Sequence, residues 1–112
     1  MAKILRVNLG GEGEVPGVLN QQPPFALGPS WFSWRHGGKT LTQLEASGLQ
    51  FVICDNEALV FADDSIDVVY SNNVPIDRDT KDGPGVQSSE VWRILKSAGR
   101  WIHNRQVIFA KP

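Results

Sequence analysis

The sequence predicts an α/β domain, in which an open and mostly parallel sheet of about five strands is combined with two or three helices. Three observations lead to this prediction. Short apolar runs recur between polar turns, which is the pattern of strands. Two stretches have helical spacing between capping residues. The apolar run at Val68 and Val69 is unbroken, as in a parallel strand that is buried on both faces.

The composition is that of one globular domain spanning residues 1–112. Hydrophobic residues make up 41% of the chain, and the formal net charge is −1, so nothing points to nucleic acid or an anionic membrane as a partner. No apolar run approaches the roughly 20 residues that span a bilayer. The single cysteine, Cys54, excludes an intrachain disulfide and a cysteine-based zinc site. Together with the lack of an export signal, it favours a cytoplasmic location.

The first strand is expected over residues 2–9 and ends at a glycine cluster, residues 10–17. Glycines directly after a first strand let the backbone take positive φ and approach a ligand closely. Their spacing is not the Gly-x-Gly-x-x-Gly of dinucleotide binders, which disfavours a nicotinamide-dependent reductase. The alternative is a glycine-rich turn that only closes the strand. Residues 18–20 follow as the stub of a second strand.

A long loop is expected over residues 21–38, where three prolines interrupt regular structure. Its aromatic residues, Trp31 among them, cluster beside Arg35 and His36. A loop of this length is usually functional or disordered, and the aromatic density argues against disorder. Two interpretations stay open. The loop is a lid or stacking surface for an adenine or a substrate, or it is an aromatic cover over the sheet in place of a missing helix.

The second half of the chain alternates between predicted strands and helices. Thr40 is a suitable N-cap for a helix over residues 40–47, and Gly48 is a suitable stop. Ser88 is a suitable cap for the second helix. The later elements are expected as strands at residues 49–54 and 66–70, a solvated loop at 78–85 and a helix at 88–97. Residues 101–103 and 106–110 are expected as the last strands, or as a single strand that bends around Asn104 and Arg105.

The longest ordered pattern in the chain begins at Asp55, directly after a predicted strand. It continues through Ala58, Leu59, Phe61, Asp63 or Asp64, Ser65, Asp67 and Val69. This stretch resembles the segment Asp-Ala-x-x-Leu-Pro-Phe-x-Asp-x-Ser-Phe-Asp-x-Val of class I S-adenosylmethionine-dependent methyltransferases. Val60 stands in place of the proline of that segment, and Ile66 in place of its second phenylalanine.

Two further segments resemble the same family. The glycine cluster is similar to its first motif, Leu-Asn-Leu-Gly-x-Gly-x-x-x-x-Pro-Gly, and residues 90–102 are similar to Glu-x-x-Arg-Val-Leu-Lys-Pro-Gly-Gly-Arg-Leu. Ser97 and Ala98 replace Pro and Gly in the latter. The resemblance covers roughly residues 3–20 and 49–102, and it implies a reduced Rossmann-like sheet in a short, divergent member of the family.

The resemblance also implies a cofactor and the residues that contact it. S-adenosylmethionine would lie with its methionine part on the glycine loop, its ribose near Asn20, where the family has an acid, and its adenine amino group at Asp55. The cofactor contacts expected in this way are Gly10, Gly11, Gly13, Asn20, Asp55, Asn56 and Ser71. The expected substrate contacts are Asn72, Asn73, Trp31 and His36. Residues 73–76 lack the Pro-Pro-aromatic motif of enzymes that methylate bases, so the acceptor is expected to be a small molecule.

Two functions from different classes are compatible with this pattern. Methyl transfer depends mainly on positioning, so the lack of a nucleophile motif does not count against an enzyme. His36, His103 and Asp77 have the right side chains for a general base, and no metal site is expected. The alternative is a catalytically inactive domain that serves as a binding or oligomerisation module. A small sheet that lacks strands exposes an edge, and a homodimer would be one way to cover it.

Overall fold

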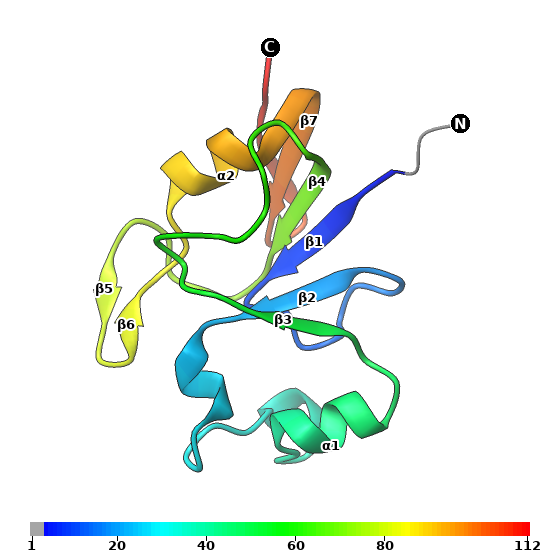
Figure 1. The fold of residues 1–112 in the computed structure, drawn as a ribbon, viewed down its shortest axis with the longest axis vertical. Helices are drawn as coiled ribbons and strands as arrows, with labels where there is room; N and C mark the ends of the chain where they lie inside the picture. Colours follow the sequence, from blue (N-terminus) through cyan, green and yellow to red (C-terminus); the bar gives the residue numbers. More distant parts are fainter. Residues whose placement is uncertain (1–3) are drawn as a thin grey trace.

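A six-stranded sheet forms the centre of the computed structural model, which describes residues 4–112 (Figure 1). Its strand order is β3-β2-β1-β4-β7-β8. The strands are β1 (Arg6–Leu9), β2 (Leu19–Gln22), β3 (Phe51–Ile53), β4 (Ile66–Ser71), β7 (Leu95–His103) and β8 (Gln106–Ala110). A separate hairpin joins β5 (Asp79–Thr80) to β6 (Gly83–Pro84). The helices are α1 (Leu41–Ala46) and α2 (Ser88–Ile94), with 3₁₀ turns at Pro24–Leu27 and Trp34–His36.

The first five strands of the sheet order are parallel, so their carboxyl ends lie at one edge. β1 pairs in parallel with β2 on one side and with β4 on the other. The chain therefore moves outward from β1 through β2 to β3, and then returns across β1 to form β4. The glycine cluster leaves β1 at this edge, and the β5–β6 hairpin lies beside it (Figure 1).

The prediction of a reduced Rossmann-like α/β sheet of about five strands is wrong. The sheet has six strands and is mixed, because β8 runs antiparallel to β7. The two α-helices of the described residues have only six and seven residues. Residues 10–18, between β1 and β2, are too few for the usual helical crossover of a dozen or more residues. Loops consequently replace most of the helices that such a sheet would carry.

The first helix confirms its predicted cap. The Thr40 hydroxyl accepts a hydrogen bond from the Gln43 amide at 3.3 Å, and the Gln43 side chain accepts one from the Thr40 amide at 2.9 Å. This reciprocal capping box fixes the start of α1. Leu41 and Leu44 form its buried face, at the spacing that the sequence indicated.

The second helix is shorter than predicted, and its cap is different. The N-cap is Gln87 rather than Ser88, whose amide and hydroxyl instead donate to the Asp77 carboxylate at 2.8 and 2.5 Å. The helix ends at Ile94 rather than at Ser97, because Leu95 is fully buried and pairs with Ile66 of β4. Burial in the sheet overrides the helix propensity of this segment.

Three other expectations need adjustment. The predicted loop at residues 78–85 contains the β5–β6 hairpin. The first strand begins at Arg6, and its expected first residues, Ala2 and Lys3, lie outside the described part of the chain. The last two predicted strands form a hairpin, with β7 already beginning at Leu95.

Among residues 4–112, the helices are too short to cross a membrane.

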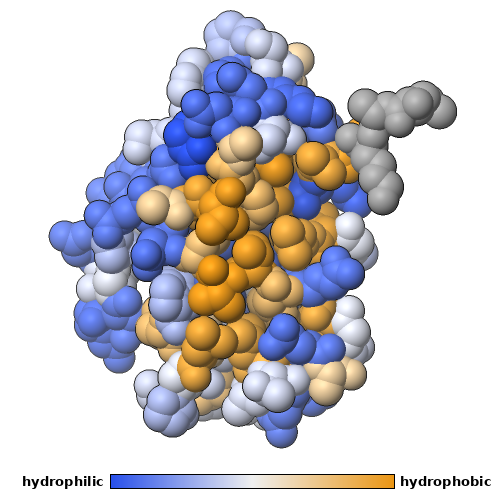
Figure 2. Space-filling view, viewed as in Figure 1, coloured by the Kyte–Doolittle hydropathy of each residue, from blue (hydrophilic) through white to orange (hydrophobic). Residues whose placement is uncertain are grey.

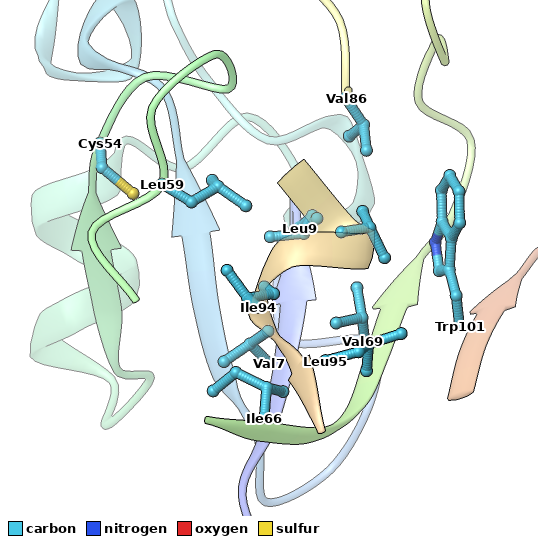
Figure 3. Packing of buried hydrophobic residues seen from close by; sticks show 11 residues of the cluster. Val7, Leu9, Cys54, Leu59, Ile66, Val69, Val86, Ile94, Leu95 and Trp101 are labelled. Atoms are coloured by element: carbon cyan, nitrogen blue, oxygen red, sulfur yellow. The ribbon is translucent and has the colours of Figure 1, made fainter. Parts of the chain in front are cut away.

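The hydrophobic core lies where α2 and the start of β7 pack on the central strands. Figure 3 shows Ile94 and Leu95 beside Val7 of β1 and Val69 of β4, and these side chains are at most 2% exposed. Leu59, from the loop between β3 and β4, joins the same cluster. The core is therefore centred on β1 and β4, the two strands next to the point where the chain reverses direction.

Arg93 of α2 fastens the loop between β3 and β4 onto this core. Its guanidinium donates to the carbonyl oxygens of Leu59 and Phe61, each at 2.8 Å, and forms ion pairs with Asp63 and Glu90 at 2.8 Å. The bonds with Glu90 and Asp63 raise the pKa of Arg93, so the guanidinium stays charged. The loop takes the place of a covering helix because α2 holds its backbone, through Arg93 and through Glu90, which accepts a hydrogen bond from the Leu59 amide at 2.8 Å.

The sheet keeps two open edges and a partly uncovered face. Figure 2 shows apolar residues gathered in a band across the middle of one face of the molecule, with hydrophilic groups around them. β3 and β8 are the edge strands, and Val107 and Ile108 of β8 are 57% and 46% exposed. The homodimer expected from an open edge stays a prediction, and β8 is the longer edge available to it.

We expect Arg93→Met to lower the free energy of unfolding by about 2–3 kcal/mol, because hydrogen bonds to a charged group contribute about 1.5–3 kcal/mol each and two loop carbonyls lose their donor. Urea unfolding followed by tryptophan fluorescence measures this change. Arg100→Met is the matched control, since Arg100 is exposed and has no side-chain hydrogen bond within residues 4–112. Equal midpoints for the two variants would contradict the role of Arg93.

Candidate functional site

A groove runs along the edge where the parallel strands end. Three adjoining hollows of about 260, 450 and 560 Å³ form it, and neighbouring hollows share lining residues. We call them the apolar end, the middle and the basic end, in that order. Gly10, Glu12, Trp31 and Val74 line both the apolar end and the middle, whereas Glu14, Arg35, Asn72 and Asn73 line both the middle and the basic end.

The groove lies where sheet topology favours a ligand. In open sheets, ligands bind outside the carboxyl ends of the strands, where neighbouring connections leave in opposite directions. Here that place is between β1 and β4. Gly10 follows β1 in the groove, and Asn72 follows β4.

The three hollows differ in chemistry. The apolar end is lined mainly by Pro23, Phe25, Trp31, Val74, Pro75, Pro84 and Val86, with polar groups from Gln22, Asn56, Thr80 and Asp82. The middle combines the carboxylates of Glu12 and Glu14 with the rings of Trp31, Phe32 and Trp34. The basic end adds Tyr70, Asn104 and Arg105 to the residues that it shares with the middle. One groove therefore offers an apolar surface, anionic groups with aromatic rings, and guanidinium groups in sequence.

The glycine loop is packed closely against β2. Gly10 and Gly13 have φ values of +66° and +85°, which side chains disfavour. A Cβ atom added at Gly11 would lie 2.4 Å from Oδ1 of Asn20 and 2.7 Å from the Asn8 side chain. These positions therefore need glycine for the shape of the loop itself, and not only for the approach of a ligand.

Three consecutive amide side chains of β2, all buried, hold this loop in place. Asn20 accepts a hydrogen bond from the Gly13 amide at 3.1 Å, and its own amide donates to the carbonyl oxygen of Gln50. Gln21 accepts from the Gly10 amide at 3.1 Å. Gln22 donates to the carbonyl oxygen of Gly11 at 3.0 Å. Both polar atoms of Asn20 are thus engaged inside the protein, at the residue that sequence reasoning assigned to a ribose.

The remaining loop amides are also hydrogen-bonded within the protein. The Gly11 amide donates to the carbonyl oxygens of Asn8 and Gln21, and the Glu12 amide donates to the Glu14 carboxylate at 2.9 Å. All four amides from Gly10 to Gly13 therefore have partners. Unlike the free amides of an anion-binding loop, they are not presented to a ligand.

Glu14 is the most unusual ionisable group of the groove. Its carboxylate accepts hydrogen bonds from Asn8 at 2.7 Å and from Asn72 at 3.0 Å. Burial alone would raise the pKa of Glu14, but the hydrogen bonds from Asn72, Asn8 and the Glu12 amide outweigh it and lower the pKa below its ordinary value. No lysine, arginine or histidine within residues 4–112 forms an ion pair with Glu14. The groove thus contains an ionised carboxylate that forms no ion pair with another described residue.

The aromatic loop is attached to the glycine loop through Glu12. The Ser33 hydroxyl donates to the Glu12 carboxylate, and Nε2 of His36 donates to the Glu12 carbonyl oxygen. Phe32 and Trp34 pack edge to face, with their ring centroids 4.8 Å apart. The His36 ring is used in this contact and lines none of the three hollows, whereas Trp31 lines two of them.

The other predicted site residues are placed unevenly. Asn72 and Asn73 line the middle and the basic end. Asn56 lines the apolar end, where its amide donates to the Pro84 carbonyl oxygen at 2.9 Å. Ser71 is fully buried and accepts a hydrogen bond from Nε1 of Trp101 at 2.9 Å, so its part is structural. Asp55 is exposed and lines none of the three hollows.

Sequence reasoning missed Glu14 as a site residue and named Arg35 only as a neighbour of the aromatic cluster. The alternation of Glu12 and Glu14 with glycines was the available signal, because carboxylates in a glycine loop do not suit an anionic ligand. Of the three candidate bases, His36 is bound to the glycine loop, Asp77 is bound to Ser88, and Nδ1 of His103 is hydrogen-bonded to Ser71. In the described part of the chain, no three metal-ligating side chains cluster.

Comparisons of the chain with models of known protein families, with curated proteins and with solved structures give no match. The function is therefore argued from the residue pattern of the sequence and from the chemistry of the groove.

We expect Glu14→Gln to make folding less sensitive to acid. Since the folded-state pKa of Glu14 lies below its ordinary value of 4.5, its contribution to stability is present above pH 4.5 and is lost as the pH falls through the folded-state pKa. The difference in free energy of unfolding between the wild type and the variant should therefore shrink below pH 4.5. Urea titrations between pH 7 and the acid range measure it.

The matched control is Glu57→Gln, which removes an exposed carboxylate without a side-chain hydrogen bond in the structure as described. We expect no comparable change for this variant. If the difference in free energy of unfolding between the wild type and Glu14→Gln stayed constant across the acid range, the hydrogen-bonded carboxylate at this position would be contradicted.

Proposed function

We propose that the groove binds S-adenosylmethionine and that the chain is a methyltransferase-like protein acting on a small-molecule acceptor. The observation that carries this proposal is the ionised carboxylate of Glu14, which has Trp31 and Trp34 beside it in the middle of the groove. A carboxylate and the faces of aromatic rings both attract a cation. The sulfonium of S-adenosylmethionine is such a cation, and the family resemblance of the sequence independently implies this cofactor.

The order of the hollows agrees with the parts of this cofactor. The apolar end, with Phe25, Trp31 and Val86 in its wall, suits a flat adenine ring. The middle suits the sulfonium. The acceptor would then approach from the basic end, where Asn72 and Asn73 lie. In this arrangement Trp31, rather than the exposed Asp55, contacts the adenine.

Methyl transfer at this site would need alignment more than acid or base groups. The acceptor's electron pair forms the new bond to the methyl carbon while the sulfur–carbon bond breaks, and the sulfur leaves as a neutral thioether. An acceptor that is already deprotonated needs no base for this step. Holding the two reactants in line supplies most of the acceleration.

The alternative is a catalytically inactive domain that serves as a binding or oligomerisation module, and one observation favours it. The four amides of the glycine loop and both polar atoms of Asn20 are used inside the protein. The groove therefore lacks the backbone donors and the ribose acid of the family. Cofactor binding without turnover, tested with a panel of small acceptors, would support this alternative.

We expect the wild type to bind both S-adenosylmethionine and S-adenosylhomocysteine, and to prefer the former because only it carries the sulfonium. Glu14→Gln should lower this preference by roughly tenfold, which corresponds to about 1.4 kcal/mol. Isothermal titration calorimetry with the two ligands measures the ratio. Glu57→Gln serves as the control, because it removes a carboxylate that lines none of the three hollows. The absence of heat with either ligand at millimolar concentration would refute the proposal.

A further inference from the structure

Arg35 is a guanidinium that faces two parts of the groove. It lines both the middle and the basic end, the two hollows that Glu14 also lines. Within residues 4–112 its side chain takes part in no ion pair and no hydrogen bond. A guanidinium without an internal partner is available to a ligand.

The backbone at Arg35 is fixed onto the glycine loop. Arg35 lies in the 3₁₀ turn Trp34–His36. Ser33, directly before this turn, and His36, its last residue, hold it in place, since both side chains donate to Glu12. The Ser33 amide also donates to the Lys39 carbonyl oxygen at 2.8 Å and closes the loop. The position of the Arg35 backbone along the groove is therefore set by contacts with the glycine loop.

An amino-acid ligand in this groove would need a new partner for its carboxylate. Loop amides are the usual donors to an anion at such a strand end, but those from Gly10 to Gly13 are already hydrogen-bonded. Among residues 4–112, Arg35 and Arg105 are the only cationic side chains that line the three hollows. Arg105 lines the basic end alone, whereas Arg35 also reaches the middle.

We propose that Arg35 binds the α-carboxylate of the methionine part of the cofactor and replaces the loop amides in this role. This inference rests on the proposed function. The planar guanidinium can bind a carboxylate through two parallel hydrogen bonds. Glu14 and Arg35, from different segments, then bind the sulfonium and the carboxylate of the ligand, which carry opposite charges. Arg35 thus determines specificity for a cofactor that retains its amino-acid part.

The test compares S-adenosylhomocysteine with 5′-methylthioadenosine, which has the same adenosine and thioether but no amino-acid part. We expect Arg35→Gln to weaken S-adenosylhomocysteine binding at least tenfold and to leave 5′-methylthioadenosine binding unchanged. Arg100→Gln is the matched control, because Arg100 is exposed and lines none of the three hollows, and it should change neither affinity. Calorimetry gives the affinities, and circular dichroism checks that each variant is folded.

The outcomes separate this inference from the proposal on which it rests. If the Arg35→Gln variant bound S-adenosylhomocysteine as tightly as the wild type, the role of Arg35 would be overturned, while the proposal of cofactor binding would stand. Equal weakening for both ligands would also overturn it, because the loss would then not involve the carboxylate. A wild type that binds neither ligand would refute the proposed function, and the assignment of Arg35 with it.

Discussion

The three buried amides of β2 are the constraint on which the binding edge depends. Asn20 and Gln22 fix the glycine loop, and Gln21 holds Gly10 while donating to the Cys54 carbonyl oxygen at 2.8 Å. Gln21 also donates to Asn56, which in turn holds the β5–β6 hairpin. A buried amide left without a partner costs about 1–3 kcal/mol, so these groups favour one joint arrangement. The loops after β1 and β3 and the hairpin are positioned together by one short strand.

Because the loop amides are hydrogen-bonded internally, the groove presents side chains rather than backbone donors. A glycine loop with free amides attracts anions, whereas here the same place carries the carboxylates of Glu12 and Glu14. Asn8 turns its amide toward Glu14 and leaves its own Oδ1 buried without a partner. The charge-assisted bond at 2.7 Å offsets that orphaned oxygen. Glu14 thus stays ionised at the groove, although Oδ1 of Asn8 is left without a hydrogen bond.

Local features of the sequence predicted local features of the structure. Apolar runs located β4, and the pattern at Thr40 located the start of α1. The early start of β7 and the early end of α2 depend on the pairing of Leu95 with Ile66, which no local pattern encodes. The same limit applies to the site. Asn72, a main partner of Glu14, lies 58 residues away, so only the assembled sheet brings the two together.

The groove depends on the order of the parallel strands and not on the helices of a Rossmann-like fold. Helices on both faces are not needed to form the groove, because its position follows from β1 having β2 on one side and β4 on the other. The loop between β3 and β4, held by Arg93, covers the core without extending into the three hollows except at Asn56. Fold class alone therefore argues neither for nor against a cofactor. The argument for the proposed cofactor comes from the charges, because a half-buried carboxylate that two side-chain amides keep ionised offers an attractive site for a cation.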